Sequence, residues 1–538
     1  MRPPSDRSWR RALAGAVGAT LLAACGGGGG GDPPPPVTPG DSLPGVVVSG
    51  ATPVAAGCTG GRTSGTVFGN AEAEPFVAIS PLDPDHLVAA WQQDRASNGG
   101  ARALVSATSF DGGRTWTRTM HPMSRCGGAA TGAPGDQERA SDPWVDFGPD
   151  GTVYLMGLSF SGTNFTPGSS SEMLVSRSVD GGRTWGPPQR LVIDGPSGFN
   201  DKNTLTADPT DARYVYAVWD RLDRFGNGPT LLARSTDGGA TWEGAREIYQ
   251  PVIDGGVSQT IGNRIVVLRE GAERGTLVNL FMQIDSVGNR VDTRVRVMRS
   301  TDQGVSWQDP VTVGNQQSLG TSDPLTGTRV RDGAIVPTIA VGPGNVLWAA
   351  WQDARINGGA RDAIVVARSV DGGRSWSAPV AANRDPSVPA FTPTLHVRAD
   401  GTLGLMHFDL RSDTPSSATL LGDLWLLTTR DGQTWTEAPL ARGFDLALAP
   451  LVTGGHFVGD YHGLVSAGGT WLPLVVLPGR DTANRTDVRA LRAEAAASAA
   501  TARVHAARMA APTPALPADF DARHREAVRQ ALAARPGR

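Results

Sequence analysis

The chain has 538 residues, a formal net charge of −3 and 19% charged residues. This nearly neutral balance, without a basic cluster, excludes a nucleic-acid-binding surface. The length alone would allow several domains, but an internal repeat overrides that expectation because one repeat architecture can occupy most of a chain.

The first 25 residues have the three parts of a signal for export. Four arginines lie within residues 1–11, an apolar run of thirteen residues spans 12–24, and the run ends in Leu22-Ala23-Ala24-Cys25. This ending resembles a bacterial lipobox, which implies that Cys25 is the lipidated first residue of the mature protein. We therefore expect an exported protein whose lipid anchor is its only contact with a membrane of the cell envelope; the alternative is an ordinary cleaved signal.

The composition divides the rest of the chain into three parts. Residues 26–43 are rich in Gly and Pro and are predicted to be a tether, because such a segment cannot bury a core. Residues 44–492 form the predicted folded domain, and residues 493–538 are an Ala- and Arg-rich tail with a possible short helix over 519–535. Cys58 and Cys126 either pair in an oxidising compartment or remain separate buried thiols.

A short motif recurs along the predicted domain. Residues 109–116 read Ser-Phe-Asp-Gly-Gly-Arg-Thr-Trp, and six copies of this motif follow one another with their aspartates 57 to 69 residues apart. Asp-Gly between two β-rich runs predicts a hairpin in which the carboxylate binds backbone amides and the Trp packs on the sheet. We assign this structural role, without a metal or other cofactor, to Asp111, Trp116, Asp180, Trp185, Asp237, Trp242, Asp302, Trp307, Asp371, Trp376, Asp431 and Trp435.

Two further strands precede each hairpin, so every repeat supplies four short antiparallel strands. This period predicts an all-β fold, a β-propeller. Beyond the sixth motif, residues 460–465, 470–477 and 486–492 supply three more strands, and residues 45–49 near the other end can supply the fourth. Seven blades are therefore favoured, with six as the alternative.

The repeated motif resembles the Asp-box, or bacterial neuraminidase repeat, of the sialidase superfamily. The resemblance implies an Asp-box β-propeller and a site with an arginine triad, a tyrosine nucleophile assisted by a glutamate, and an aspartate acid/base. It directs attention to Tyr461 as nucleophile and to Asp142 or Asp201 as acid/base, with Asp94 as a further candidate. The chain departs from the family where Glu74-Pro75-Phe76 replaces an Arg-Ile-Pro type motif, and the nearest acidic neighbour of Tyr461 in sequence is Asp460.

Strand direction predicts where a ligand would bind. The entry of the first strand and the exit of the second lie on one face of a propeller, whereas the repeated motif lies on the other. On the first of these faces an Asp with a nearby Arg recurs at the strand exits, either to tie blades together or to bind a carboxylate. The candidate ligand-binding residues on this face are Arg95, Lys202, Asp353, Arg355, Arg411, Asp460 and His462.

The sequence thus predicts a lipid-anchored, sialidase-like propeller that acts on or binds glycans, with exo-glycosidase activity as one possibility. The alternative is a non-catalytic propeller that binds carbohydrate or a surface protein. A mouth blocked by loops or bulky side chains would instead indicate a purely structural protein. We expect a monomer.

Overall fold

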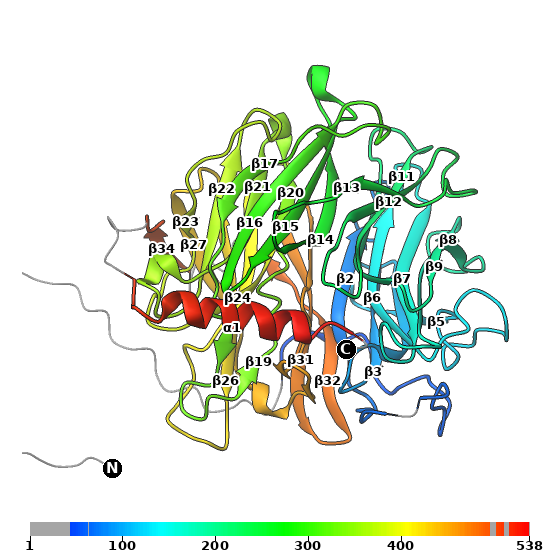
Figure 1. Ribbon diagram of the computed structural model, residues 1–538, viewed down its shortest axis with the longest axis horizontal. Coiled ribbons are helices and arrows are strands. Elements are labelled where there is room, and N and C mark those ends of the chain that lie inside the picture. The colour runs from blue at the N-terminus through cyan, green and yellow to red at the C-terminus, as the bar shows by residue number, and fades with distance from the viewer. Residues whose placement is uncertain (1–42, 63, 495–501, 510–515, 537–538) are drawn as a thin grey trace, which may run out of the picture. The chain divides into compact units, whose positions relative to one another are not determined.

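The computed structural model describes residues 43–62, 64–494, 502–509 and 516–536. Within these residues the chain is almost entirely β-structure, with a single α-helix, α1 (Phe520–Ala533), near the C-terminus (Figure 1). No helix in the described segments is both long and apolar enough to cross a membrane. The predicted signal, Cys25 and nearly all of the predicted tether lie outside the described residues.

The strands follow one another in groups of four that are antiparallel. The groups are β2 (Ala73–Ile79), β3 (Leu87–Arg95), β4 (Ala101–Ser109) and β5 (Thr117–His121); β6 (Arg139–Phe147), β7 (Val153–Ser161), β8 (Ser170–Ser178) and β9 (Gln189–Asp194); β10 (Phe199–Ala207), β11 (Val215–Leu222), β12 (Thr230–Ser235) and β13 (Arg246–Tyr249); β14 (Val257–Val267), β15 (Leu277–Val287), β16 (Arg290–Ser300) and β17 (Val311–Asn315); β20 (Thr338–Val341), β21 (Leu347–Asp353), β22 (Ala363–Ser369) and β23 (Val380–Ala381); β24 (Ala390–Val397), β25 (Leu403–Asp409), β26 (Leu421–Thr429) and β27 (Thr434–Asp445); and β30 (Gly463–Ala467), β31 (Thr470–Asp481) and β32 (Asn484–Ala490) with β1 (Val46–Val47).

The groups close into a ring. The first strand of each group contacts the first strand of the next, in the order β2, β6, β10, β14, β20, β24 and β30, and β30 contacts β2 again. In the last group β1 supplies the fourth strand: it pairs antiparallel with β32, with Val46 opposite Ala490. The N-terminal strand therefore completes the sheet that lacked one strand, as the sequence predicted, and the fold is an all-β propeller.

Short elements decorate this ring. A small sheet joins β18 (Thr321–Ser322) and β19 (Arg329–Val330) to β28 (Leu451–Val452) and β29 (Gly455–His456), while β33 (Ala493–Glu494) and β34 (Arg503–Ala506) pair with β31 and β27. Short 3-10 helices lie at η1 (Gly271–Glu273), η2 (Pro343–Asn345), η3 (Arg355–Asn357) and η4 (Leu446–Leu448).

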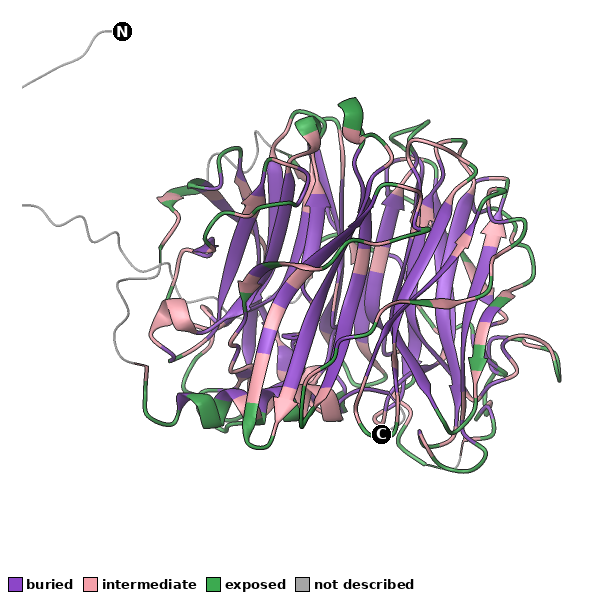
Figure 2. Ribbon diagram, turned by 45° about the horizontal axis from the view of Figure 1, so that its top comes forward, coloured by how far each residue is buried: buried purple, intermediate pink, exposed green. Residues whose placement is uncertain are grey.

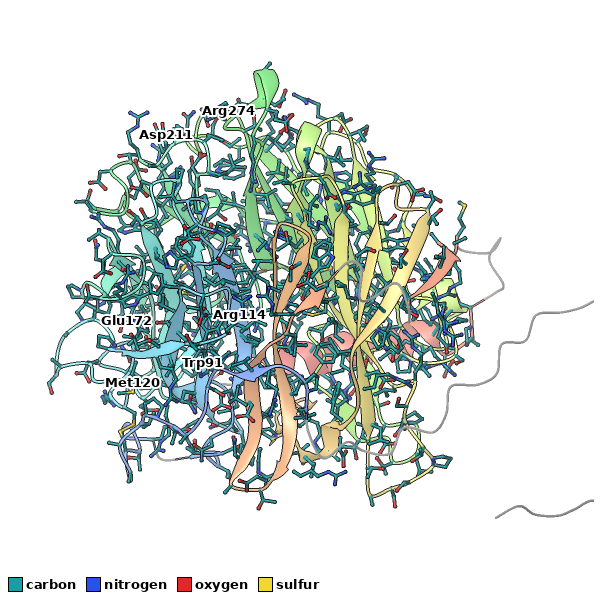
Figure 3. All side chains as sticks on the ribbon, turned by 180° about the vertical axis from the view of Figure 1, so that it is seen from behind. Trp91, Arg114, Met120, Glu172, Asp211 and Arg274 are labelled. Atoms are coloured by element: carbon teal, nitrogen blue, oxygen red, sulfur yellow. A yellow bond between two sulfur atoms is a disulfide. The ribbon has the colours of Figure 1, made fainter. Side chains whose placement is uncertain are left out.

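The core lies between neighbouring sheets, because each sheet packs on a sheet at both of its faces. Most strand residues are buried and exposure is concentrated in the connecting loops (Figure 2). A tryptophan recurs at the same place in the second strand: Trp91, Trp219 and Trp351 are at most 1% exposed. Figure 3 shows Trp91 within the sheets, whereas Asp211 and Arg274 lie in loops at one end. Around the ring axis, the first strands line a cavity of about 1000 Å³ that extends toward the turns after these strands.

Each repeated loop is held by hydrogen bonds between its own residues. Asp111 Oδ1 accepts hydrogen bonds from the amides of Arg114 and Thr115, both at 2.9 Å, and Oδ2 accepts from the Thr115 hydroxyl at 2.6 Å. These hydrogen bonds, above all those from Thr115, lower the pKa of Asp111 to about 2. The Trp116 indole N–H donates to the Gly113 carbonyl at 3.0 Å. Each loop joins the third strand of a sheet to its fourth strand. It lies at the end of the sheet opposite to the exit of the second strand, where Arg95 ends β3.

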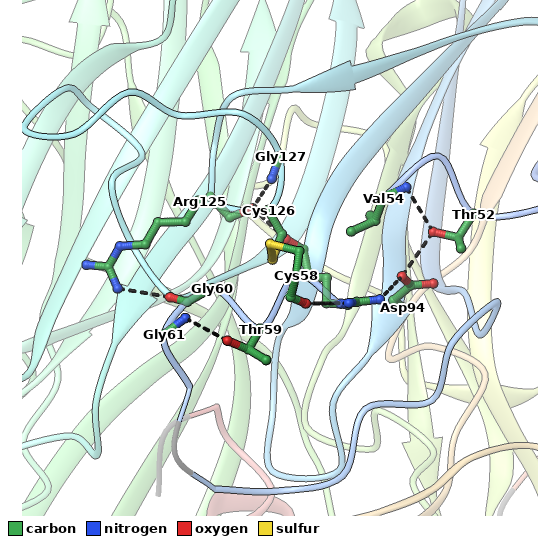
Figure 4. Close-up of a disulfide and its surroundings, with 12 residues drawn as sticks. Thr52, Val54, Cys58, Thr59, Gly60, Gly61, Asp94, Arg125, Cys126 and Gly127 are labelled. Atoms are coloured by element: carbon green, nitrogen blue, oxygen red, sulfur yellow. Dashed lines mark hydrogen bonds and ion pairs between the residues drawn. A yellow bond between two sulfur atoms is a disulfide. The ribbon is translucent and has the colours of Figure 1, made fainter. Parts of the chain in front are cut away.

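Cys58 and Cys126 form a disulfide (Figure 4). It links the segment before β2 to the connection between β5 and β6, across a sequence separation of 68 residues. The same segment is held by Arg102, whose Nε donates to the Cys58 carbonyl at 2.7 Å. Of the two possibilities that the sequence left open, the structure therefore has the paired one.

Candidate functional site

Five of the first strands have a bulge at their entries. The antiparallel register shifts between Ala73 and Phe76 in β2, and the same irregularity recurs in β6, β10, β14 and β24. One residue of each bulge has a positive φ, which is strained for any residue except glycine. Bulges re-aim side chains. The residues held in this way are Glu74, Asp142, Lys202, Gly262 and Thr392, with φ of 53°, 51°, 49°, 67° and 50°.

Three of these bulges meet at one ammonium group. Lys202 Nζ lies 3.0 Å from Glu74 Oε1, 3.4 Å from Asp142 Oδ1 and 2.7 Å from Asp460 Oδ2. The Lys202 side chain is 5% exposed, so these ion pairs are largely shielded from water. We call Lys202, Glu74, Asp142 and Asp460 the Lys202 cluster; it joins residues of three blades with Asp460, which lies just before β30.

Two arginines border the Lys202 cluster. Arg331 Nε donates to Asp460 Oδ1 at 3.0 Å, and its Nη2 binds the other oxygen of the same carboxylate. The guanidinium carbons of Arg331 and Arg95 lie 4.5 Å and 4.7 Å from the centre of the Phe457 ring. Arg95 Nη1 donates to Gln92 Oε1 at 2.5 Å, while Arg95 Nε and Nη2 are buried without a hydrogen-bond partner in the described part of the chain.

The carboxyl groups of the cluster have opposite pKa shifts. Burial raises the pKa of Glu74 well above its usual range, because the attraction of Lys202 does not compensate for the loss of water. Burial also disfavours ionised Asp142, but the Lys202 ammonium together with hydrogen bonds from Glu74 and Asp201 outweighs this effect and lowers the pKa of Asp142 to about 2. For Asp460, Arg331 and Lys202 together outweigh burial and lower the pKa well below the usual range. Burial thus favours the protonated form of Glu74, whereas the neighbouring cations favour the ionised forms of Asp142 and Asp460.

Tyr461 lies beside the cluster, within an aromatic group. Its hydroxyl donates to the Pro143 carbonyl at 3.1 Å, and its ring centre lies 5.4 Å from that of Trp144. Burial, and then the carboxyl of Glu74, raise the pKa of Tyr461 well above its usual value. The glutamate near Tyr461 is thus Glu74. It is distant from Tyr461 in sequence and therefore was not among the candidates close to Tyr461 in the chain.

The remaining predicted arginines bind partners in their own blades, and Arg355 Nη2 also donates to the Asn315 carbonyl of β17, in the preceding blade, at 2.6 Å. Arg355 Nε donates to Asp353 Oδ1 at 3.0 Å, and Arg411 binds Asp409 together with both oxygens of Glu437, each at 2.7 Å. These contacts favour the interpretation in which the recurring Asp and Arg residues stabilise the blades. No contact joins Arg355 or Arg411 to Arg95 among the described residues.

Two other predicted residues have partners outside the Lys202 cluster. His462 is buried beside Phe408, with ring centres 4.9 Å apart, and burial lowers its pKa to about 3, so it is neutral. Asp201 binds the guanidinium of Arg535, which comes from the C-terminal segment, at 2.6 Å. Within the described residues, no group of His, Cys, Asp and Glu side chains is arranged to hold a metal ion.

Sequence reasoning singled out Asp142, Lys202 and Asp460 but missed Glu74 and Arg535 as site residues. A signal for Glu74 is present in the sequence. Glu74-Pro75-Phe76 and Asp142-Pro143-Trp144 have the same order of acid, proline and aromatic residue at the entries of successive blades. In the structure, Phe76 and Trp144 stack with ring centres 3.6 Å apart.

Comparison with known proteins finds similarity to sialidases in sequence and in structure. No family model matches the chain. A sialidase of Micromonospora viridifaciens is 27% identical over 318 residues, which cover 54% of this chain and 44% of that protein. The chain thus spans less than half the length of the curated relative that it matches.

Solved structures with a similar arrangement include two sialidase-type proteins and an arabinanase. Hadza microbial sialidase Hz136 matches with a TM-score of 0.43 and 18% identity over 77% of this chain and 75% of that one. A Penicillium chrysogenum α-L-arabinanase has a TM-score of 0.43 and 14% identity over 64% and 93%, and the leech intramolecular trans-sialidase 0.40 and 14% over 82% and 72%. The chain is a β-propeller protein, and about half of its length is similar in sequence to a sialidase.

Proposed function

We propose that this protein is an exported, lipid-anchored glycoside hydrolase of sialidase-like type, with its site at the Lys202 cluster. The observation that carries the proposal is the pair Glu74 and Asp142, two buried carboxyl groups that bind one ammonium, at 3.0 Å and 3.4 Å, and whose pKa values are shifted in opposite directions. Pairs of carboxyls with pKa values driven apart are the usual acid and base of glycoside hydrolysis.

In this proposal the two carboxyls have different roles. Glu74 in its protonated form donates its proton to the oxygen of the leaving group as the glycosidic bond breaks, and ionised Asp142 stabilises the positive charge that develops on the sugar. A water molecule then adds to the anomeric carbon, and the proton that it loses returns to Glu74. Tyr461 and Asp201, the other predicted catalytic residues, are held by Pro143 and Arg535. The two unpartnered nitrogens of Arg95 suit a sugar that carries a carboxylate.

A non-catalytic glycan-binding propeller is the second candidate. One observation favours it: both ionised aspartates of the cluster are already neutralised by Lys202 or Arg331, and the C-terminal segment lies over the same place. A site filled with satisfied ion pairs needs a ligand to replace them, which is more easily reconciled with binding than with rapid turnover.

A panel of fluorogenic glycosides, with sialosides included, distinguishes the two candidates. We expect hydrolysis by the wild-type protein or by Arg535→Ala, and a loss of at least about 100-fold in kcat/KM on adding Glu74→Gln or Asp142→Asn. Glu247→Gln, which removes an exposed carboxyl of β13, is the matched control and should leave the rate unchanged. If neither parent protein hydrolyses any glycoside, the enzymatic proposal is wrong; glycan binding that Arg95→Met abolishes would then support the second candidate.

A further inference from the structure

The C-terminal segment lies at the Lys202 cluster, because Ala534 and Arg535 line one cavity with Lys202 and Asp460. Figure 1 shows α1 of this segment crossing in front of the sheets between the labels of β24 and β19. Phe520 and Val528 of α1 are buried, and His524 Nδ1 is 2.8 Å from the Ser318 carbonyl oxygen. Beyond α1, the Ala534 carbonyl accepts a hydrogen bond from Arg331 at 2.6 Å, and the Pro536 carbonyl accepts one from Asn164 at 2.7 Å. The last described residues are therefore fixed at the mouth of the ring.

Arg535 enters the mouth itself. Its side chain is 2% exposed, and the carboxylates of Asp201 and Asp220 around it are completely buried. Nε donates to Asp201 Oδ2 at 2.6 Å, Nη1 donates to Gln259 Oε1 at 3.0 Å, and Nη2 binds Asp220. Each of the three guanidinium nitrogens thus donates a hydrogen bond to a different acceptor.

The acceptors form a cradle that the sheet builds without the tail. Asp201 of β10 and Asp220 of β11 stand opposite each other in the antiparallel register, so their carboxyls are neighbours whether or not Arg535 is present. The second oxygen of each carboxyl, Oδ1, is buried and has no hydrogen-bond partner among the described residues. Burial raises the pKa of Asp201 above its usual value and that of Asp220 to about 8, although Arg535 is present. Two adjacent buried carboxyl groups therefore ionise together only beside a cation, and a planar, multiply donating cation satisfies them better than an ammonium does.

We propose that Asp201, Asp220 and Gln259 form a guanidinium-binding subsite in the ring mouth, and that Arg535 is its intramolecular ligand. Arg535 and Lys202 line one cavity of about 40 Å³, together with Ala531 and Ala534 of the C-terminal segment. A ligand with a guanidinium group competes with Arg535 for this subsite, and departure of the segment opens the way to the Lys202 cluster.

Competition can be measured on the unmodified full-length protein. Methylguanidinium chloride at millimolar concentrations should increase hydrogen exchange of the α1 amides in a saturable manner, because it occupies the subsite whenever Arg535 leaves. Methylammonium chloride at the same ionic strength is the control for charge, and the amides of β15 are the control for general unfolding. If α1 exchanges at the same rate at every concentration of methylguanidinium, Arg535 is not a displaceable ligand and the proposal fails.

Substitution in the full-length chain locates the subsite. Arg535→Ala should bind methylguanidinium at least tenfold more tightly than the wild-type protein does, since the competing side chain is gone. Adding Asp220→Asn to Arg535→Ala should weaken that binding at least tenfold, whereas Arg529→Ala, on an exposed part of α1, should behave as wild type. Equal binding with and without Asp220→Asn would place the guanidinium elsewhere and overturn the proposal.

The two experiments do not use hydrolysis as a readout. Failure of the glycosidase proposal would therefore leave the guanidinium subsite standing, and the exchange experiment remains decisive if Arg535→Ala does not fold.

Discussion

Lys202 contacts three buried carboxyl groups at once, and its charge favours the ionised forms of Asp142 and Asp460. Its ammonium contacts residues from three blades and its side chain is 5% exposed. Such a group contributes less through its attraction than through the penalty that appears when it is lost, because uncompensated charges then remain in a poorly solvated place.

Replacement of Lys202 by Met should therefore destabilise the folded protein strongly. We expect a loss of about 3–5 kcal/mol in the free energy of unfolding, measured by urea denaturation at neutral pH. Arg213→Met is the control, since the pair of Arg213 with Asp211 is exposed to solvent and should leave the free energy of unfolding nearly unchanged. Equal effects of the two substitutions would contradict the account of the Lys202 cluster.

For single residues, the sequence predicted several members of the site correctly but not the residues that they contact. Lys202 and Asp460 were placed at strand entries by counting strands, and they do meet. Glu74, which binds Lys202, and Arg535, which binds Asp201, were not predicted as site residues, because they lie 128 residues before Lys202 and 334 residues after Asp201 in the chain. Strand counting assigns a face of the ring but no position around the axis, and it carries no information on where a terminal segment packs.

The repeated loops are stabilised by their own aspartates, and this has a consequence at acid pH. The pKa values of Asp111, Asp180, Asp237, Asp302 and Asp371 are lowered from 3.8 to about 2 by hydrogen bonds within each loop, which outweigh burial. Because the folded pKa is the lower one, their contribution to stability is fully present above about pH 4 and is lost as the pH falls through about 2.

Asp111→Asn should reproduce part of this loss at neutral pH. We expect a decrease of about 1 kcal/mol in the free energy of unfolding at pH 7, which shrinks as the pH falls from 5 toward 2 because the wild-type carboxylate then protonates as well. Urea denaturation at several pH values measures it. Asp254→Asn, at an exposed position outside these loops, should show no such convergence; a difference for Asp111→Asn that is independent of pH would argue against the role of its charge.

The disulfide has its effect mainly on the unfolded chain. A crosslink between residues 68 positions apart should stabilise the fold by at most about 4 kcal/mol through the entropy of the unfolded state. We expect the double variant Cys58→Ser/Cys126→Ser and the reduced wild-type protein to unfold at the same lower urea concentration. Wild-type protein that is insensitive to reductant under unfolding conditions would contradict this expectation.

The ring depends on a strand that the N-terminal part of the chain contributes. Val48 is buried, and its N–H donates to the Val488 carbonyl at 2.8 Å beside the pairing of β1 with β32. Closure of this kind leaves no sheet edge between the first and the last blade.

Val48→Pro removes that donor and should open the ring at one place. We expect a loss of about 3 kcal/mol and faster proteolysis within β30, β31 and β32 than in the other sheets. The exposed neighbour Val47, changed to Thr, is the matched control. Uniform proteolysis of all sheets would show that the last blade does not depend on β1.

Export and anchoring concern the whole molecule and are tested in cells. If Cys25 carries lipid, the protein produced in a bacterium should fractionate with membranes, and Cys25→Ala should release it in soluble form. A fatty-acid label that is retained on Cys25→Ala would contradict the proposed anchor. The disulfide of the folded domain agrees with an oxidising compartment.

The fold was predictable from the sequence because a repeat multiplies a weak signal. One Asp-Gly hairpin indicates little, but six copies at a regular period predicted an all-β ring and the role of β1 in its last sheet. The bulges at the strand entries were not predicted, since Glu74, Asp142 and Lys202 adopt a positive φ that their residue types do not favour.

Lys202 is the only lysine of the chain. An acylating reagent that attacks uncharged amines can therefore react only with Lys202 and with the terminal amino group. Lipidation of the terminus would leave Lys202 as the single target. Because Lys202 is buried among carboxylates, its modification reports by mass a single event, the opening of the ring mouth to water. The rate at which Lys202 is acylated therefore measures the rate of that opening, and no label has to be introduced into the protein.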